Sequence, residues 1–194
     1  AEKLLSPSPD RTADDCRVYP RCGGCSLRHI SYEAELDIKQ THVQDAMTRI
    51  GKLDIEVLPI IGAPSTAGYR NKAQYPVVEI DGRLTAGFYA SGTHRVVPNT
   101  RCPLQPEVFG DILEHTLELC QARGIKAYNE QEQTGILRHI YIRRGTVTGE
   151  IMVCLVINAE TLPDGKGIAK TLTERFPDIK SVVLSVNKKN RSEE

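Results

Sequence analysis

Four of the six cysteines are spaced so that they could bind a metal centre together. Cys16 precedes Cys22 by six positions, a Gly-Gly pair separates Cys22 from Cys25, and Cys102 is followed by a proline. A Cys-x2-Cys turn places two thiolates near one centre, and the glycines let the backbone bend so that its N–H groups face bound sulfur. An all-cysteine ligand set favours an iron–sulfur cluster held by Cys16, Cys22, Cys25 and Cys102.

The same spacing is compatible with other interpretations. Zn²⁺ also accepts four thiolates in a closed structural site, and the four residues could simply be free thiols. His29 lies four residues after Cys25 and is an alternative ligand. Cys120 and Cys154 stand within apolar patterns, which predicts that they pack in the core as small hydrophobic residues.

Basic residues gather in two segments, 69–101 and 137–144, and aromatic side chains lie among them. The first segment holds five Arg or Lys residues against two acidic ones, together with Tyr, Phe and His side chains. Cations beside aromatic rings suit phosphate contact combined with base stacking, as in RNA-binding surfaces. The alternative is an ordinary solvated sheet face whose aromatic residues point inward.

The sequence contains no recognisable catalytic centre. The segment Gly165-Lys166-Gly167 precedes a predicted helix but follows a Pro-Asp turn instead of a strand, so it does not match a dinucleotide or S-adenosylmethionine loop. No Ser/His/Asp arrangement or carboxylate pair is recognisable.

The composition is that of a soluble globular protein. The chain has 194 residues, of which 40% are hydrophobic and 26% charged, with 25 basic and 25 acidic side chains. These values exclude disorder and a membrane span, and the absence of a signal-peptide core favours the cytoplasm. The zero net charge is compatible with a basic face that is balanced by acidic residues on the helix at 105–123.

Local patterns predict about three helices and a set of hairpins. Helical spacing with end signals such as Ser31 and Gly51 indicates the helices, and Asp81-Gly82 and Ser91-Gly92 indicate hairpin turns. The predicted fold class is α+β: a mostly antiparallel sheet of hairpins packed with about three helices, plus an N-terminal Cys-rich loop. The predicted helices span 32–50, 105–123 and 166–176, and the β-rich segments span 55–61, 69–97, 137–143, 150–157 and 181–186.

The chain divides into three parts. Residues 1–15 contain clustered Ser and Pro and are predicted to be a linker or disordered arm, 16–187 a single domain, and 188–194 a truncated tail. The missing initiator Met and the end directly after a strand indicate a piece of a longer protein.

An ordered series of motifs resembles one enzyme family. The series covers the chain from about residue 16 to 187 and resembles the bacterial ribosomal-RNA uracil-C5 methyltransferases that carry a 4Fe-4S cluster. Its members are Cys-x5-Cys-Gly-Gly-Cys-x3-His, Tyr69-Arg70-Asn71-Lys72-Ala73-Gln74, Gly87-Phe88-Tyr89 with His94, Cys102-Pro103-Leu104-Gln105, Thr134-Gly135-Ile136-Leu137-Arg138-His139 and Thr148-Gly149-Glu150-Ile151-Met152-Val153.

The resemblance implies the central domain of a three-part enzyme that forms 5-methyluridine. An RNA-binding β-barrel would precede it, and a domain with the S-adenosylmethionine site, the nucleophilic cysteine and the general base would follow, so the fragment alone is expected to be inactive. The implied cofactors are a 4Fe-4S cluster on the four cysteines and S-adenosylmethionine on the missing domain. The implied partner is ribosomal RNA, not DNA or a membrane, and the protein is expected to be a monomer.

In such an enzyme, the central domain represented by this chain would bind the RNA. The residues expected to contact RNA are Arg70, Lys72, Phe88, Tyr89, Arg138 and His139. The alternative function is a zinc-stabilised interaction module with no role in RNA binding.

Overall fold

The computed structural model describes residues 5–13 and 15–188, so the predictions for residues 1–4, 14 and 189–194 lie outside the described residues. Among the described residues no helix is both long and apolar enough to cross a membrane. The elements are α1 (Tyr32–Asp45), the π-helical turn η1 (Ala46–Ile50), β1 (Lys72–Ile80), β2 (Arg83–Tyr89), β3 (Val96–Pro98), α2 (Glu107–Ala122), β4 (Leu137–Arg144), β5 (Ile151–Ile157), α3 (Gly165–Arg175) and β6 (Ile179–Val186).

The six strands form one mixed sheet in the order β3-β2-β1-β4-β5-β6. All neighbouring pairs are antiparallel except β5 and β6, which are parallel because α3 crosses between them. The predicted α+β class is therefore confirmed. At the β1–β2 turn Asp81 and Gly82 have φ values of 51° and 73°, as the predicted Asp-Gly hairpin turn requires.

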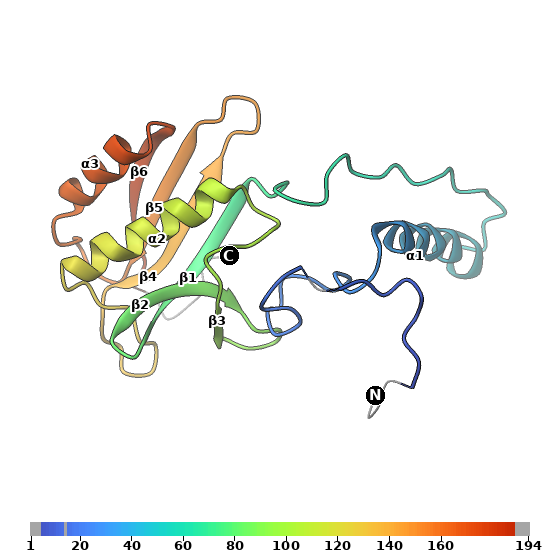
Figure 1. Cartoon of the computed structure of the whole chain (residues 1–194), viewed down its shortest axis with the longest axis horizontal. Helices are drawn as coiled ribbons and strands as arrows, with labels where there is room; N and C mark the ends of the chain where they lie inside the picture. The colour runs from blue at the N-terminus through green and yellow to red at the C-terminus, as the bar shows by residue number, and fades with distance from the viewer. Residues whose placement is uncertain (1–4, 14, 189–194) are drawn as a thin grey trace.

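One face of the sheet carries the main hydrophobic core. Helices α2 and α3 both pack on this face, as Figure 1 shows. Alternate residues of each strand point toward the helices because side chains in a strand alternate between its two faces. Fully buried examples are Tyr75 on β1, Ile140 and Ile142 on β4, and Phe109 and Leu113 on α2. Cys120 is also fully buried there, in agreement with its predicted core role.

The opposite face of the sheet has no helix on it within the described part of the chain. The strand register places Gln74 of β1, Tyr141 of β4 and Cys154 of β5 side by side, and Lys72 pairs with Arg143 in the adjacent row. Cys154 is only partly buried. The prediction that it packs in the core was therefore wrong, because the register puts it opposite the helices.

The helix predicted at 32–50 is present, but it does not pack on the core. It is α-helical to Asp45 and continues as η1 to Ile50. No residue of either element is buried, and Ile50 is 82% exposed. In Figure 1 this helix stands apart from the sheet at the end of a long extended segment. The apolar periodicity therefore predicted the helix correctly, but it did not predict that the helix stays away from the core.

The β-rich segment 55–61 does not form a strand. Its backbone instead bonds to two glutamine side chains of α1. Gln44 donates to the Ile55 carbonyl (3.0 Å) and accepts from the Val57 N–H (2.9 Å), and Gln40 donates to the carbonyls of Val57 and Leu58 (both 3.1 Å). These amides take the place of a neighbouring strand, so β propensity alone misassigned the segment.

Candidate cysteine cavity and nucleic-acid interface

The four cysteines predicted as ligands line one small cavity of about 30 Å³. Cys16, Cys22 and Cys25 come from an irregular loop, whereas Cys102 comes from the segment between β3 and α2. The Gly23 N–H donates to the Tyr89 carbonyl at the end of β2 (3.1 Å), which holds the loop on the sheet. A Cβ at Gly23 would lie 2.9 Å from the Ser91 backbone nitrogen, so this close approach requires glycine.

The cavity walls place cationic groups beside the thiols. Arg28 and Arg70 both line it, and the Arg70 guanidinium donates to the Gly24 carbonyl (3.2 Å). Burial raises the pKa of Cys25, the two arginines oppose this, and the thiols of Cys22 and Cys16 add to it. Burial is also the largest cause of the raised pKa of Cys102. The thiols are therefore close enough to influence one another's ionisation.

The cavity does not have the geometry of a single-ion site. Within residues 5–13 and 15–188, no group of three or more His, Cys, Asp or Glu side chains is placed to hold one metal ion. His29, the alternative ligand, does not line the cavity. Its Nδ1 lies 2.5 Å from the Tyr19 hydroxyl. The shared cavity thus contains the four thiols without His29.

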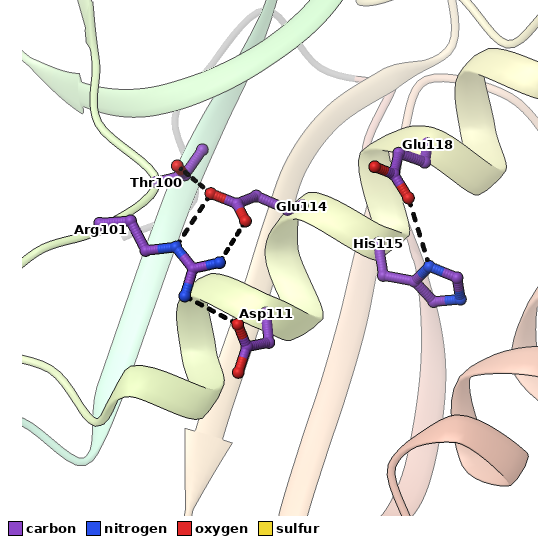
Figure 2. A network of polar contacts seen from close by, with 6 residues as sticks. All are labelled: Thr100, Arg101, Asp111, Glu114, His115 and Glu118. Carbon is purple, nitrogen blue, oxygen red and sulfur yellow. Dashed lines mark hydrogen bonds and ion pairs between the residues drawn. The ribbon is translucent and has the colours of Figure 1, made fainter.

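An ion-pair network fixes the residues just before Cys102 to α2 (Figure 2). The Arg101 guanidinium binds both oxygens of Glu114 and donates to Asp111 (2.7 Å), while the Thr100 hydroxyl donates to Glu114 (2.7 Å). Gly110 allows this approach, because a Cβ there would lie 2.7 Å from the Arg101 Cδ. Arg101 therefore anchors the cysteine segment, although the sequence pattern counted it among the basic residues of an RNA surface.

The six residues predicted to contact RNA fall into three places. Arg70 and Phe88 line the cysteine cavity, and Phe88 also packs on Tyr75 with ring centroids 5.2 Å apart. Lys72 lies on the uncovered sheet face. The other three, Tyr89, Arg138 and His139, line a single open hollow.

The hollow has a volume of about 540 Å³ and lies between the β2–β3 turn and the loop before β4. In it the Tyr89 hydroxyl lies 3.4 Å from His139 Nε2. Burial, with a contribution from the Arg138 charge, lowers the pKa of His139 to about 4, so this imidazole is neutral near pH 7. The Arg138 guanidinium stacks 4.7 Å from the Tyr128 ring centre and donates to the Asn187 carbonyl (3.2 Å).

Two further residues, neither of them among the six predicted to contact RNA, belong to this candidate interface. Tyr141 lies on the uncovered face with the Lys72 ammonium 5.7 Å from its ring centre, and His94 stacks on Tyr89 at a centroid distance of 5.3 Å. The position of Tyr141 could have been predicted from the sequence. Ile140 and Ile142 are apolar and mark the buried face of the strand, and successive strand residues point to opposite faces, so Tyr141 lies on the other face. The Ser91-Gly92 signal predicted the turn between β2 and β3, but it did not predict that His94 would stack on Tyr89.

Comparison with known proteins relates the chain to RNA methyltransferases. Models of protein families give no match. A Bacillus cereus protein named an uncharacterized RNA methyltransferase is 43% identical over 188 residues, covering 96% of this chain and 41% of that protein. A protein of the same name from Halalkalibacterium halodurans is 42% identical over 187 residues, with the same coverage. The chain therefore spans about two fifths of the length of these relatives.

A solved structure shows the same arrangement of elements. It is the crystal structure of Pyrococcus abyssi tRNA (uracil-54, C5)-methyltransferase in complex with S-adenosyl-L-homocysteine. The TM-score is 0.70 and the sequence identity 26%, and the match covers 98% of this chain and 41% of that one. Both the sequence and the fold thus support a relationship to the RNA methyltransferases.

Proposed function

We propose that this chain is the RNA-binding, cluster-holding part of a cytoplasmic S-adenosylmethionine-dependent methyltransferase that forms 5-methyluridine in ribosomal RNA. The relationship to RNA methyltransferases supports the reaction class, and the likeness to a tRNA uracil-C5 enzyme with bound S-adenosyl-L-homocysteine supports uracil C5 as the target. Ribosomal RNA is favoured over transfer RNA by the resemblance of the motif series alone. The domain boundaries proposed are a linker at 1–15, one domain at 16–187 and a tail at 188–194.

The observation that carries the proposal is the composition of the uncovered sheet face. Lys72 and Arg143 flank Tyr141 there, and Gln74 lies beside it. Nucleobases stack on aromatic rings presented by an open sheet, and neighbouring cations bind the phosphates. A sheet face of this kind next to an open hollow suits single-stranded RNA whose bases are unstacked.

The donor set of the cysteine cavity supports a 4Fe-4S cluster as its occupant. Its donors are all thiols, and Arg28 and Arg70 are placed to offset the negative charge of thiolate ligands. When bound, the cluster would join the loop of Cys16, Cys22 and Cys25 to the segment of Cys102. We assign it a structural role, because methyl transfer from S-adenosylmethionine to uracil involves no net electron transfer.

The chemistry of uracil explains why RNA must be held firmly. Its C5 becomes nucleophilic only after a thiolate adds to C6, and C5 then takes the methyl group from S-adenosylmethionine. A base afterwards removes the C5 proton, and the thiolate leaves C6. A stacked uracil cannot expose both faces, so the target nucleotide has to be flipped out of the strand. In this proposal the thiolate and the base belong to another domain, and residues such as Lys72 and Tyr141 hold the flanking nucleotides. The chain alone is therefore expected to be inactive.

The RNA role is tested by removing charge from the uncovered face. In the full-length protein, Lys72→Ala and Arg143→Ala should each weaken binding to a ribosomal-RNA hairpin and reduce its salt dependence, because each removes one phosphate contact. Lys166→Ala, at the start of α3 on the other side of the sheet, is the matched control. Equal affinity in all three variants would refute this RNA interface. Methyl transfer to ribosomal RNA and to transfer RNA, compared side by side, decides the substrate.

The cluster is tested by anaerobic purification. We expect a brown protein with an absorption band at about 400 nm and about four irons per chain, as a 4Fe-4S centre requires. A colourless protein with one equivalent of zinc would establish the alternative, a zinc-stabilised module. Cys102→Ser should lower the iron content, whereas Cys120→Ser, at the buried core cysteine, leaves all four thiols in place and should not.

A further inference from the structure

Helix α1 and the extended segment that follows it form one unit, which we call the α1 module (residues 32–63). The segment runs back along the helix. Gln44, near the end of α1, donates to the Ile55 carbonyl (3.0 Å), and Tyr32, at its start, accepts from the Ala63 N–H (2.6 Å). The module is therefore held together by its own contacts, although it stands apart from the sheet in Figure 1.

Large apolar side chains are exposed on this module. On the helical part, Val43, Met47 and Ile50 follow one another at the i, i+4 and i+7 spacing of one helix face. The segment adds Leu58 and Ile61, which are 81% and 96% exposed. Large apolar side chains that are exposed together mark an interaction site.

The helical stripe and the segment adjoin each other. Met47 lies three positions after Gln44, which makes the two residues neighbours on the helix surface. Gln44 in turn holds the segment through hydrogen bonds to Ile55 and Val57. The two groups of apolar side chains thus belong to one surface.

The main chain of the segment is as uncovered as its side chains. Within the described part of the chain, residues 54–62 make no hydrogen bond to other main-chain groups. The N–H of Val57 is bonded by the Gln44 side chain, whereas the N–H groups of Leu58 and Ile61 have no acceptor among the described residues. Because buried main-chain groups need partners, a surface that covers this segment has to supply acceptors as well as apolar contacts.

Both ends of the module are fixed beside the cysteine cavity. Arg28, which lines the cavity, lies four residues before α1, and Arg70, beyond the segment, lines it too. The Gly68 N–H donates to the carbonyl of Pro103 (2.9 Å), the residue after Cys102. A body that binds the module is thereby tied to the part of the protein that holds the cysteines.

The charge of the module argues against RNA as its partner. Residues 32–63 contain six acidic and three basic side chains. RNA phosphates are bound by surfaces with an excess of Lys and Arg, so this surface would repel them.

The relatives point to a further part of the same polypeptide. The matches to the Bacillus cereus and Pyrococcus abyssi proteins cover nearly all of this chain, the module included. They cover only about two fifths of those proteins, so most of the length of each lies outside the match. A counterpart of the module thus occurs together with a larger remaining part in one chain.

We propose that the apolar surface of the α1 module binds the domain of the full-length protein that carries the S-adenosylmethionine site. The identity of that domain rests on the proposed function, whereas the exposed surface does not. The interface holds the catalytic domain beside the part that binds RNA.

Hydrogen exchange of the full-length protein, followed by mass spectrometry, tests whether the surface is covered. Without a covering surface, the amides of Leu58 and Ile61 exchange as in an unstructured peptide of the same sequence, because the module offers them no acceptor. We expect peptides spanning 54–62 to exchange at least about tenfold more slowly than that reference. Exchange at the unstructured rate would overturn the proposal.

A pair of substitutions tests whether apolar contact provides the protection. Ile61→Asp places a charge in the interface and should return 54–62 to fast exchange in the full-length protein. Val147→Asp is the matched control, because Val147 is also 96% exposed but lies between β4 and β5. Equal protection in both folded variants would contradict the interface. The wild-type measurement decides by itself if Ile61→Asp does not fold, which circular dichroism shows.

Photo-cross-linking identifies the partner. In the full-length protein with Ile61 replaced by p-benzoylphenylalanine, we expect a cross-link within one polypeptide, to a peptide of the domain that binds S-adenosylmethionine. A cross-link between two copies, or to added ribosomal RNA, would overturn the proposal. If 54–62 is unprotected while RNA binding and methyl transfer are intact, this inference fails and the proposed function stands. If the cross-linked domain does not bind S-adenosylmethionine and no methyl transfer occurs, both fail.

Discussion

Arg101 and Glu114 are joined by two hydrogen bonds, from Nε to Oε1 (3.0 Å) and from Nη2 to Oε2, across the gap between the Cys102 segment and α2. A planar guanidinium facing a carboxylate in this way restricts orientation as well as distance. Arg101 directly precedes Cys102, and Glu114 lies on α2. The pair therefore connects the packing of a core helix to the geometry of the cysteine cavity.

Gly110→Ala should move the Cys102 segment away from α2. The new Cβ would lie 2.7 Å from the Arg101 Cδ and 3.0 Å from the Thr100 carbonyl oxygen, so the segment has to move away from α2. We expect a loss of about 1–3 kcal/mol in the free energy of unfolding, measured by urea denaturation. Gly165→Ala is the control, since the nearest atom to its Cβ would be at 3.5 Å. Equal stability of both variants would show that the approach at Gly110 is not tight.

Glu114→Gln should change how stability depends on pH. The hydrogen bond from Arg101 lowers the pKa of Glu114 below its ordinary value of 4.5. The folded protein therefore holds this proton less tightly than the unfolded chain, so the contribution to stability is present above pH 4.5 and is lost as the pH falls below it. Thermal denaturation between pH 6 and pH 3 should show a smaller decline for the variant than for wild type. A parallel decline would contradict the shift.

His139→Gln should remove a second, separate pH effect. Burial lowers the pKa of His139 from 6.5 to about 4 in the folded protein. Between these two values the unfolded chain binds a proton that the folded protein does not, so stability decreases as the pH falls from 6.5 to 4. The slope for one proton is about 1.4 kcal/mol per pH unit. Urea denaturation across this range should give a shallower slope for the variant, and His42→Gln, on the exposed helix α1, serves as the control.

Cys120 should resist alkylation in the folded protein. It is fully buried, and burial raises the pKa of its thiol to about 11, so almost no thiolate is present near neutral pH. Mass spectrometry after iodoacetamide treatment should find Cys120 unmodified until denaturant is added. Modification of Cys120 at the same rate in both conditions would mean that α2 does not pack as described.

Much of the local structure could be predicted from the sequence. Helix-forming periodicity around Ile112 and Leu117 and the Asp81-Gly82 turn depend on neighbours only a few residues away, so α2 and the first hairpin were located correctly. The Cys16–Cys25 spacing also needs no tertiary information. The β propensity of 55–61 predicted a strand that does not form, because the side-chain amides of Gln40 and Gln44 bond to this backbone in place of a neighbouring strand.

The order of the strands and the surroundings of each residue were decided by the tertiary structure. Cys102 joins the other three cysteines through tertiary contacts of the segment after β3, among them the ion pairs of Arg101 with α2 and the backbone hydrogen bonds from Gly68 to Pro103 and from Arg70 to Leu104. Arg70 and Lys72 are two residues apart, yet one lines the cysteine cavity and the other the uncovered face. The sequence by itself determined which residues form helices and turns, because those preferences are local. Which residues meet in the cavity and the hollow depended on long-range pairing, which short segments do not encode.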